Sequence, residues 1–190
     1  MVAAAVGSGS ARRYLWWAAA AGAMGYLLIM ASFGTRPPDK QLVKFEAKGL
    51  LAIAPESVHS VAVRIGQQQV SLERDGQGGW KNAGTGAPLG KEAARQLDLA
   101  VKIMHTSNPI RELTAAELQG TPLSDFGLER PHLSITLSDE RGEVLAFTLG
   151  TANPQNLLQY LQVKGSSSVH LMSGFIGSEW DKVASALGTP

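Results

Sequence analysis

The stretch from residue 133 to residue 149, LSITLSDERGEVLAFTL, decides the fold. Its first half alternates apolar with polar side chains, which is the two-residue period of a half-buried strand. The alternating apolar residues are Leu133, Ile135 and Leu137. The polar residues from Asp139 to Gly142 are typical of a turn, and residues 144–149 favour a return strand. The stretch therefore predicts an antiparallel hairpin that buries one face.

Similar patterns on both sides of this hairpin extend the prediction to the rest of the domain. Residues 61–72 and residues 160–171 each predict a further pair of strands. Apolar residues occur at helical spacing from residue 91 to residue 104 and again from residue 178 to residue 187, where Ser178 is the expected N-cap. The sequence therefore predicts an α+β fold of two antiparallel β-hairpin-plus-helix units, in which each sheet face is covered by its own helix.

The segment between the two predicted units contains a helix-start signal. Thr114 and Glu117 stand three residues apart, which is the spacing of a capping box at a helix N-terminus. The residues from Leu113 to Leu128 therefore predict a short helix followed by a turn.

A long apolar segment precedes the domain. Residues 14–33, YLWWAAAAGAMGYLLIMASF, contain no charged side chain, and as a helix they would rise about 30 Å, the hydrocarbon thickness of a bilayer. The segment predicts a single-pass transmembrane anchor with the C-terminal domain outside the cytoplasm, and a cleaved signal peptide is the alternative. The residues expected at the membrane interface are Arg12, Arg13, Tyr14, Trp16 and Trp17.

The same segment carries small residues four positions apart. Ala18 and Gly22 form one such pair, and Ala21 and Gly25 form another, which is the spacing that lets a second helix approach closely. These four residues predict a helix-packing face. The alternative is that a segment rich in alanine meets this pattern by chance.

The predicted domain organisation follows from these segments. Residues 1–13 are expected to be a flexible cytoplasmic tail, residues 14–33 the anchor helix, residues 34–40 a Pro-containing linker, and residues 41–190 an α+β domain. Within residues 43–48, apolar and charged side chains alternate, which predicts a first strand.

Composition excludes several classes of function. The chain has 17 Lys and Arg against 16 Asp and Glu, a net charge of +1, so it lacks the basic surplus expected of a nucleic-acid binder. It has no cysteine, which excludes disulfides, thiolate metal sites and cysteine nucleophiles. The sequence predicts no nucleic-acid partner.

The remaining reactive residue types form no recognised motif. G-x-S-x-G and Walker A sequences do not occur, and the carboxylates are spread through predicted turns. The four histidines lack metal-ligand spacing. They are His59, His105, His132 and His170. The sequence therefore predicts no catalytic residue, no cofactor, no metal ligand and no enzymatic activity.

Segments spread along the domain resemble the bacterial DUF4340 family. They are DGQGGWKN (75–82), FGLERPHLSITL (126–137), FTLG (147–150), YLQV (160–163) and SVHL (168–171). The resemblance covers about residues 57 to 183 and concerns turn and core positions. It implies a protein of the bacterial inner membrane with one N-terminal anchor helix, a periplasmic domain and no assigned activity. Some relatives resemble auxiliary parts of ABC-type transport systems, whereas this chain has a single family unit and no ATPase motif.

The sequence leaves two functions to compare. The first is a non-catalytic accessory, scaffold or assembly subunit of a larger membrane complex, with other membrane-protein subunits as partners. The second is a tethered periplasmic binding module for a peptide, an envelope polymer or a transporter-associated substrate.

Overall fold

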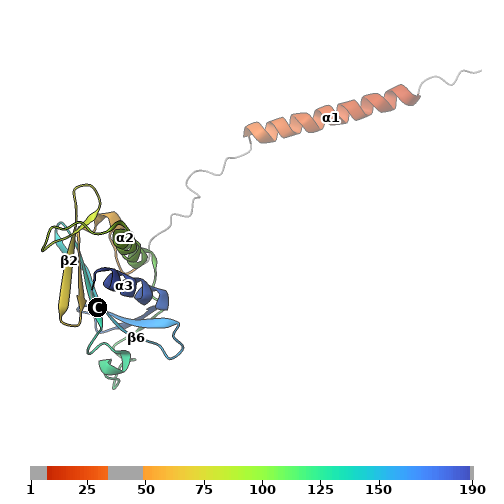
Figure 1. Cartoon of the computed structure of the whole chain (residues 1–190). Coiled ribbons are helices and arrows are strands. Elements are labelled where there is room, and N and C mark those ends of the chain that lie inside the picture. The colour runs from red at the N-terminus through yellow and green to blue at the C-terminus, as the bar shows by residue number, and fades with distance from the viewer. Residues whose placement is uncertain (1–7, 34–48, 189–190) are drawn as a thin grey trace, which may run out of the picture. The chain divides into compact units, whose positions relative to one another are not determined.

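A computed structural model describes the backbone of residues 8–33 and 49–188 (Figure 1). The chain divides into two units, Met1–Phe45 and Glu46–Pro190, which are taken separately below. The predicted linker at residues 34–40 and the predicted strand at residues 43–48 lie outside the described residues.

The second unit is built on one antiparallel sheet of eight strands, in the order β3-β2-β1-β5-β6-β7-β8-β4. Its elements in chain order are η2 (Pro55–Ser57), β1 (Ser60–Ile65), β2 (Gln68–Arg74), β3 (Trp80–Asn82), α2 (Lys91–Thr106), β4 (Arg111–Leu113), η3 (Leu123–Phe126), β5 (Leu133–Asp139), β6 (Gly142–Ala152), β7 (Leu158–Val163), β8 (Val169–Ser173) and α3 (Gly174–Ala186). The three predicted strand pairs and the helix after residue 91 are confirmed.

The prediction of two separate hairpin-plus-helix units is wrong, because the two halves share one sheet. Strand β1 pairs with β5 along its whole length, with Val61 opposite Leu137 and Val63 opposite Ile135. Apolar positions on the two strands therefore point to the same side, and this match in register joins the first hairpin to the central one.

Both long helices of this unit lie side by side on one face of the sheet (Figure 1). The prediction that each helix covers a different face is therefore also wrong. The alternating residues of the central strands point to this face and form one core with the inner sides of α2 and α3. The large buried side chains of this core include Trp80, Trp180, Phe147, Leu97, Met104 and Ile135.

Helix α3 begins earlier than the sequence predicts. Its N-cap is Ser173 rather than Ser178, and the Ser178 hydroxyl donates a hydrogen bond to the Phe175 carbonyl instead. The glycines of the first turn hid this start, because glycine disfavours helix. Gly177 leaves room for the side-chain amide of Gln159 on β7, which would have to shift if a methyl group were added there.

The capping box of Thr114 and Glu117 forms, but the short helix that it predicts does not. The Thr114 amide donates to Glu117 Oε2 at 2.9 Å, and the Glu117 amide donates to Thr114 Oγ1 at 3.4 Å. The bond from the Thr114 amide, with further bonds from Arg111 and the Thr114 hydroxyl, lowers the pKa of Glu117 to about 2. The chain then turns, because Gly120 has a positive φ and Pro122 cannot continue a helix.

The first unit contains helix α1 (Ser8–Phe33), whose side chains are described from residue 14 to residue 30. Among the described residues, no helix combines the length and the apolar character needed to cross a bilayer. The predicted transmembrane anchor is therefore wrong, and so is the predicted single-pass location in the bacterial inner membrane with a periplasmic domain.

One carboxylate is buried where α2 and α3 meet. Glu179 is 2% exposed and accepts hydrogen bonds from Lys182 at 2.6 Å and from the Gln96 side chain of α2. The Lys182 hydrogen bond, helped by Gln96 and opposed by burial, lowers the pKa of Glu179 below its usual value of 4.5. Glu179 therefore ties the two helices together in its charged form.

Replacing this carboxylate is expected to make stability less dependent on pH. A carboxyl with a lowered folded-state pKa stabilises the fold above its unfolded pKa and loses that contribution as the pH falls through the folded value. We expect Glu179→Gln to lower the free energy of unfolding by about 1 kcal/mol at neutral pH, and the difference from the parent protein to shrink below pH 4.5. Urea titrations at several pH values measure this.

The matched control is Glu92→Gln, which removes an exposed carboxylate three residues from its partner Arg95 on α2. It should leave the denaturation midpoint unchanged at neutral pH. An equal effect of the two substitutions would show that burial between the helices does not matter.

Candidate functional site

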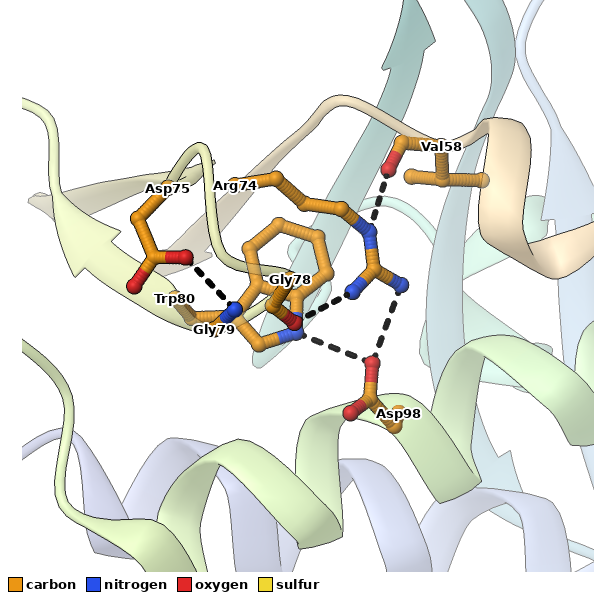
Figure 2. Close-up of polar contacts among 7 residues, drawn as sticks. All are labelled: Val58, Arg74, Asp75, Gly78, Gly79, Trp80 and Asp98. Carbon is orange, nitrogen blue, oxygen red and sulfur yellow. Dashed lines mark hydrogen bonds and ion pairs between the residues drawn. The ribbon is translucent and has the colours of Figure 1, made fainter.

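Arg74, at the end of β2, is the centre of a dense polar cluster (Figure 2). Its Nε donates to the Val58 carbonyl at 3.0 Å, Nη1 donates to the Gly78 carbonyl at 3.2 Å, and Nη2 donates to Asp98 Oδ1 at 3.0 Å. The guanidinium carbon lies 4.4 Å from the centroid of the Trp80 ring, which adds a cation–π contact.

Asp98 of α2 is shared between two donors in this cluster. Besides the Arg74 bond, its Oδ1 accepts the indole N–H of Trp80 at 3.0 Å, as Figure 2 shows. Trp80 is 1% exposed, so this bond satisfies a donor that water does not reach. Because each guanidinium nitrogen already has a protein acceptor, the cluster holds β2, the β2–β3 turn and α2 together.

A pocket of ≈ 460 Å³ opens beside this cluster, at the end of β1, β2 and β5. Its charged lining mixes signs, with Glu56, Asp139 and Glu140 against Arg74 and Arg141. The Asp139 carboxylate already has a partner in its own turn, where Oδ1 accepts a hydrogen bond from the Arg141 backbone N–H at 2.7 Å. The pocket therefore presents no field of a single sign to a charged ligand.

A second hollow, of ≈ 400 Å³, lies over the central strands. Most of its lining residues from the central strands alternate with the core residues, so their side chains are on the sheet face turned away from α2 and α3. They are Ala62, Arg64, Ser134, Thr136, Ala146 and Thr148, and the core residues Ile135 and Phe147 also line the hollow. We call this hollow the open groove.

Helix α1 carries most of the site residues expected from the sequence. Tyr14, Trp16 and Trp17 are 74%, 70% and 74% exposed. A methyl group added at Gly22 or Gly25 would meet no atom within 4 Å. Ala18 and Ala21 lie on the same side of the helix as these glycines, by their spacing of three and four residues. The side chains of Arg12 and Arg13 lie outside the described residues.

The histidines have separate structural positions. His105 Nδ1 lies 3.0 Å from the Leu51 carbonyl, and His132 Nε2 lies 3.2 Å from Asp181 Oδ1. Among the described residues, no group of three or more His, Cys, Asp or Glu side chains is arranged to hold a metal ion.

In the described part of the chain, three carboxyl groups have a pKa shifted from its ordinary value, and all three are shifted downward. The pKa of Glu92 is lowered by its hydrogen bond with Arg95, and those of Glu117 and Glu179 by the bonds described above. A general acid needs a shift in the opposite direction. These groups act as hydrogen-bond acceptors and ion-pair partners.

Comparison with known proteins adds no relative: no protein-family model, curated protein or solved structure matches the chain. The resemblance to the DUF4340 family therefore stays a prediction. The open groove was not predicted, because its lining residues come from strands whose pairing and register the sequence alone does not show.

The Arg74 cluster generates a stability prediction. We expect Asp98→Ala to lower the free energy of unfolding by about 1–3 kcal/mol, because it leaves the buried Trp80 indole N–H and Nη2 of Arg74 without their acceptor. Urea denaturation measures the change. Asp181→Ala, which removes an exposed partner of His132, should change the value by less than about 0.5 kcal/mol. Similar losses in both variants would contradict the role assigned to the cluster.

Proposed function

We propose that this protein is a non-catalytic accessory or scaffold subunit of a larger protein complex, and that it joins this complex through α1. The observation that carries the proposal is the exposed apolar surface of this helix. Each of its large apolar side chains between residues 14 and 30, where side chains are described, is between 55% and 74% exposed. They are Tyr14, Leu15, Trp16, Trp17, Met24, Tyr26, Leu27, Leu28, Ile29 and Met30.

Apolar side chains surround this helix rather than forming one stripe. Residues 26–30 are consecutive and apolar, and consecutive residues in an α-helix point about 100° apart. A helix that is apolar on all sides is typical of one that is enclosed by other structure. Water contact with so large an apolar surface is unfavourable, which supports a partner that covers α1.

The small residues of α1 indicate the shape of that partner. Ala18, Ala21, Gly22 and Gly25 lie on one side of the helix, and the space beside both glycines is open. A second helix can approach closely along such a stripe. We therefore expect the partner to present an apolar helix to this side of α1.

The chemistry of α1 also predicts how the complex responds to salt. Residues 14–33 contain no Asp, Glu, Lys or Arg, so contacts with this segment are apolar. Added salt screens charge pairs but leaves apolar contacts in place. The complex should therefore survive 1 M salt during purification.

The side of α1 that carries the small residues is tested by substitutions in the full-length chain. The chain is isolated with an affinity tag from its native host. We expect the double substitution Gly22→Leu and Gly25→Leu to remove at least nine-tenths of a stoichiometric partner, because leucine side chains hold the partner helix away. Ala20→Leu with Ala23→Leu is the matched control, since it places the same two leucine side chains on the opposite side of α1. Quantitative mass spectrometry of the purified complex measures the partner.

Three outcomes would contradict the proposal. They are recovery of the parent chain as a lone monomer, equal loss of partner in both variants, and association of α1 with lipid vesicles or with the chain's own second unit in place of a partner subunit.

A further inference from the structure

We propose that the open groove binds a small carbohydrate that bears a carboxylate. The inference stands independently of the proposed function, because it rests on the sheet of the second unit and not on α1. The proposed ligand lies on the face of the sheet opposite α2 and α3.

Two rows of side chains cross this face. In the first row, Arg64 lies opposite Gln69 on one side and Ser134 on the other, and Ser134 in turn lies opposite Thr148. Every member of this row is polar. Their positions are fixed by the sheet ladder, so the groove needs little reorganisation to present these groups.

The second row forms a low floor. Ala62 lies opposite Thr136, and Thr136 lies opposite Ala146, so one hydroxyl stands between two methyl groups. Beyond them, the Lys164 amide donates to the Ala146 carbonyl at 2.8 Å, which places Lys164 at the far end of the row. The short side chains of Ala62 and Ala146 are what leaves the hollow of ≈ 400 Å³ above the strands.

Arg64 supplies the charge that selects an anion. Its side chain is exposed, and in the described part of the chain its hydrogen bond goes to the neutral Gln69 Oε1, at 3.1 Å, with no carboxylate in ion-pair range. Arg74, Arg95 and Arg111 each face a carboxylate. A guanidinium without an acidic partner has donors free for a bidentate contact with a carboxylate.

Lys164 is the second cation of the groove, and Glu143 holds it with contacts of 2.8 and 3.1 Å. Three strand-to-strand intervals of about 4.8 Å separate β1 from β7, so the backbones that carry the two cations lie roughly 14 Å apart across the sheet. The hydroxyls of Ser134, Thr136 and Thr148 lie on the strands between β1 and β7. This order matches a ligand with a carboxylate near one end and several hydroxyl groups along its length.

An acidic peptide fits the groove less well. Peptides that bind sheets pair with a free strand edge, and specificity comes from pockets for side chains. The groove lies over β1, β5 and β6, which have strand neighbours on both sides in the sheet order. Its floor has no deep apolar pocket, since Ile135 and Phe147 are 1% and 2% exposed and point to the core.

Calorimetric titration of the full-length chain tests the inference with four probes: digalacturonate, neutral digalactose, galacturonate and a triglutamate peptide. We expect digalacturonate to bind with millimolar or lower Kd, and neutral digalactose to bind at least tenfold more weakly. Arg64→Gln should weaken digalacturonate binding at least tenfold. Thr136→Val, which replaces a hydroxyl by a methyl group of similar size, should weaken it severalfold.

The control variant is Arg141→Gln, because Arg141 is an exposed cation of the other pocket. It should leave digalacturonate binding unchanged, and circular dichroism confirms that each variant is folded. The inference is overturned if digalacturonate does not bind, if the triglutamate peptide binds equally well, or if Arg64→Gln and Arg141→Gln have the same effect. These results leave the proposed role of α1 unaffected, because that role is measured by partner recovery.

Discussion

The two-residue alternation of the central strands is the constraint on which the second unit depends. Strands β1, β5 and β6 pair so that Val63, Ile135 and Phe147 stand in one row on one face. Burial of this face requires cover, and α2 and α3 both supply it from the same side. The opposite face carries the alternate residues of the same strands, which are short or polar, such as Ala62, Ser134 and Thr136.

Polar contacts then fix the positions of the two helices along the sheet, which the apolar core does not determine. Arg74 connects the end of β2 to α2 through Asp98, and Glu179 connects α3 to α2 through Gln96. Both contacts join segments that lie far apart in the sequence. The core sets which face of the sheet is buried, and these contacts set where the helices lie along it.

The sequence predicts the local elements well, because each depends on neighbouring residues. The alternation of Leu133, Ile135 and Leu137 and the capping box of Thr114 and Glu117 both form as expected. The joining of the halves depends on the long-range pairing of β1 with β5, which no local pattern carries. The open groove was missed for the same reason, and the membrane prediction for α1 rests on a long uncharged segment with flanking arginines and aromatic residues, whereas no described helix is long and apolar enough to cross a bilayer.

The central functional claim is that a partner subunit covers α1, and hydroxyl-radical footprinting of the native complex tests it most directly. Trp16 and Trp17 are the reporters, and the buried Trp80 and Trp180 are the internal reference. The account predicts strong oxidation of both reporters in the purified chain and oxidation near the reference level in the complex. Equal oxidation of Trp16 and Trp17 in the two states would contradict it.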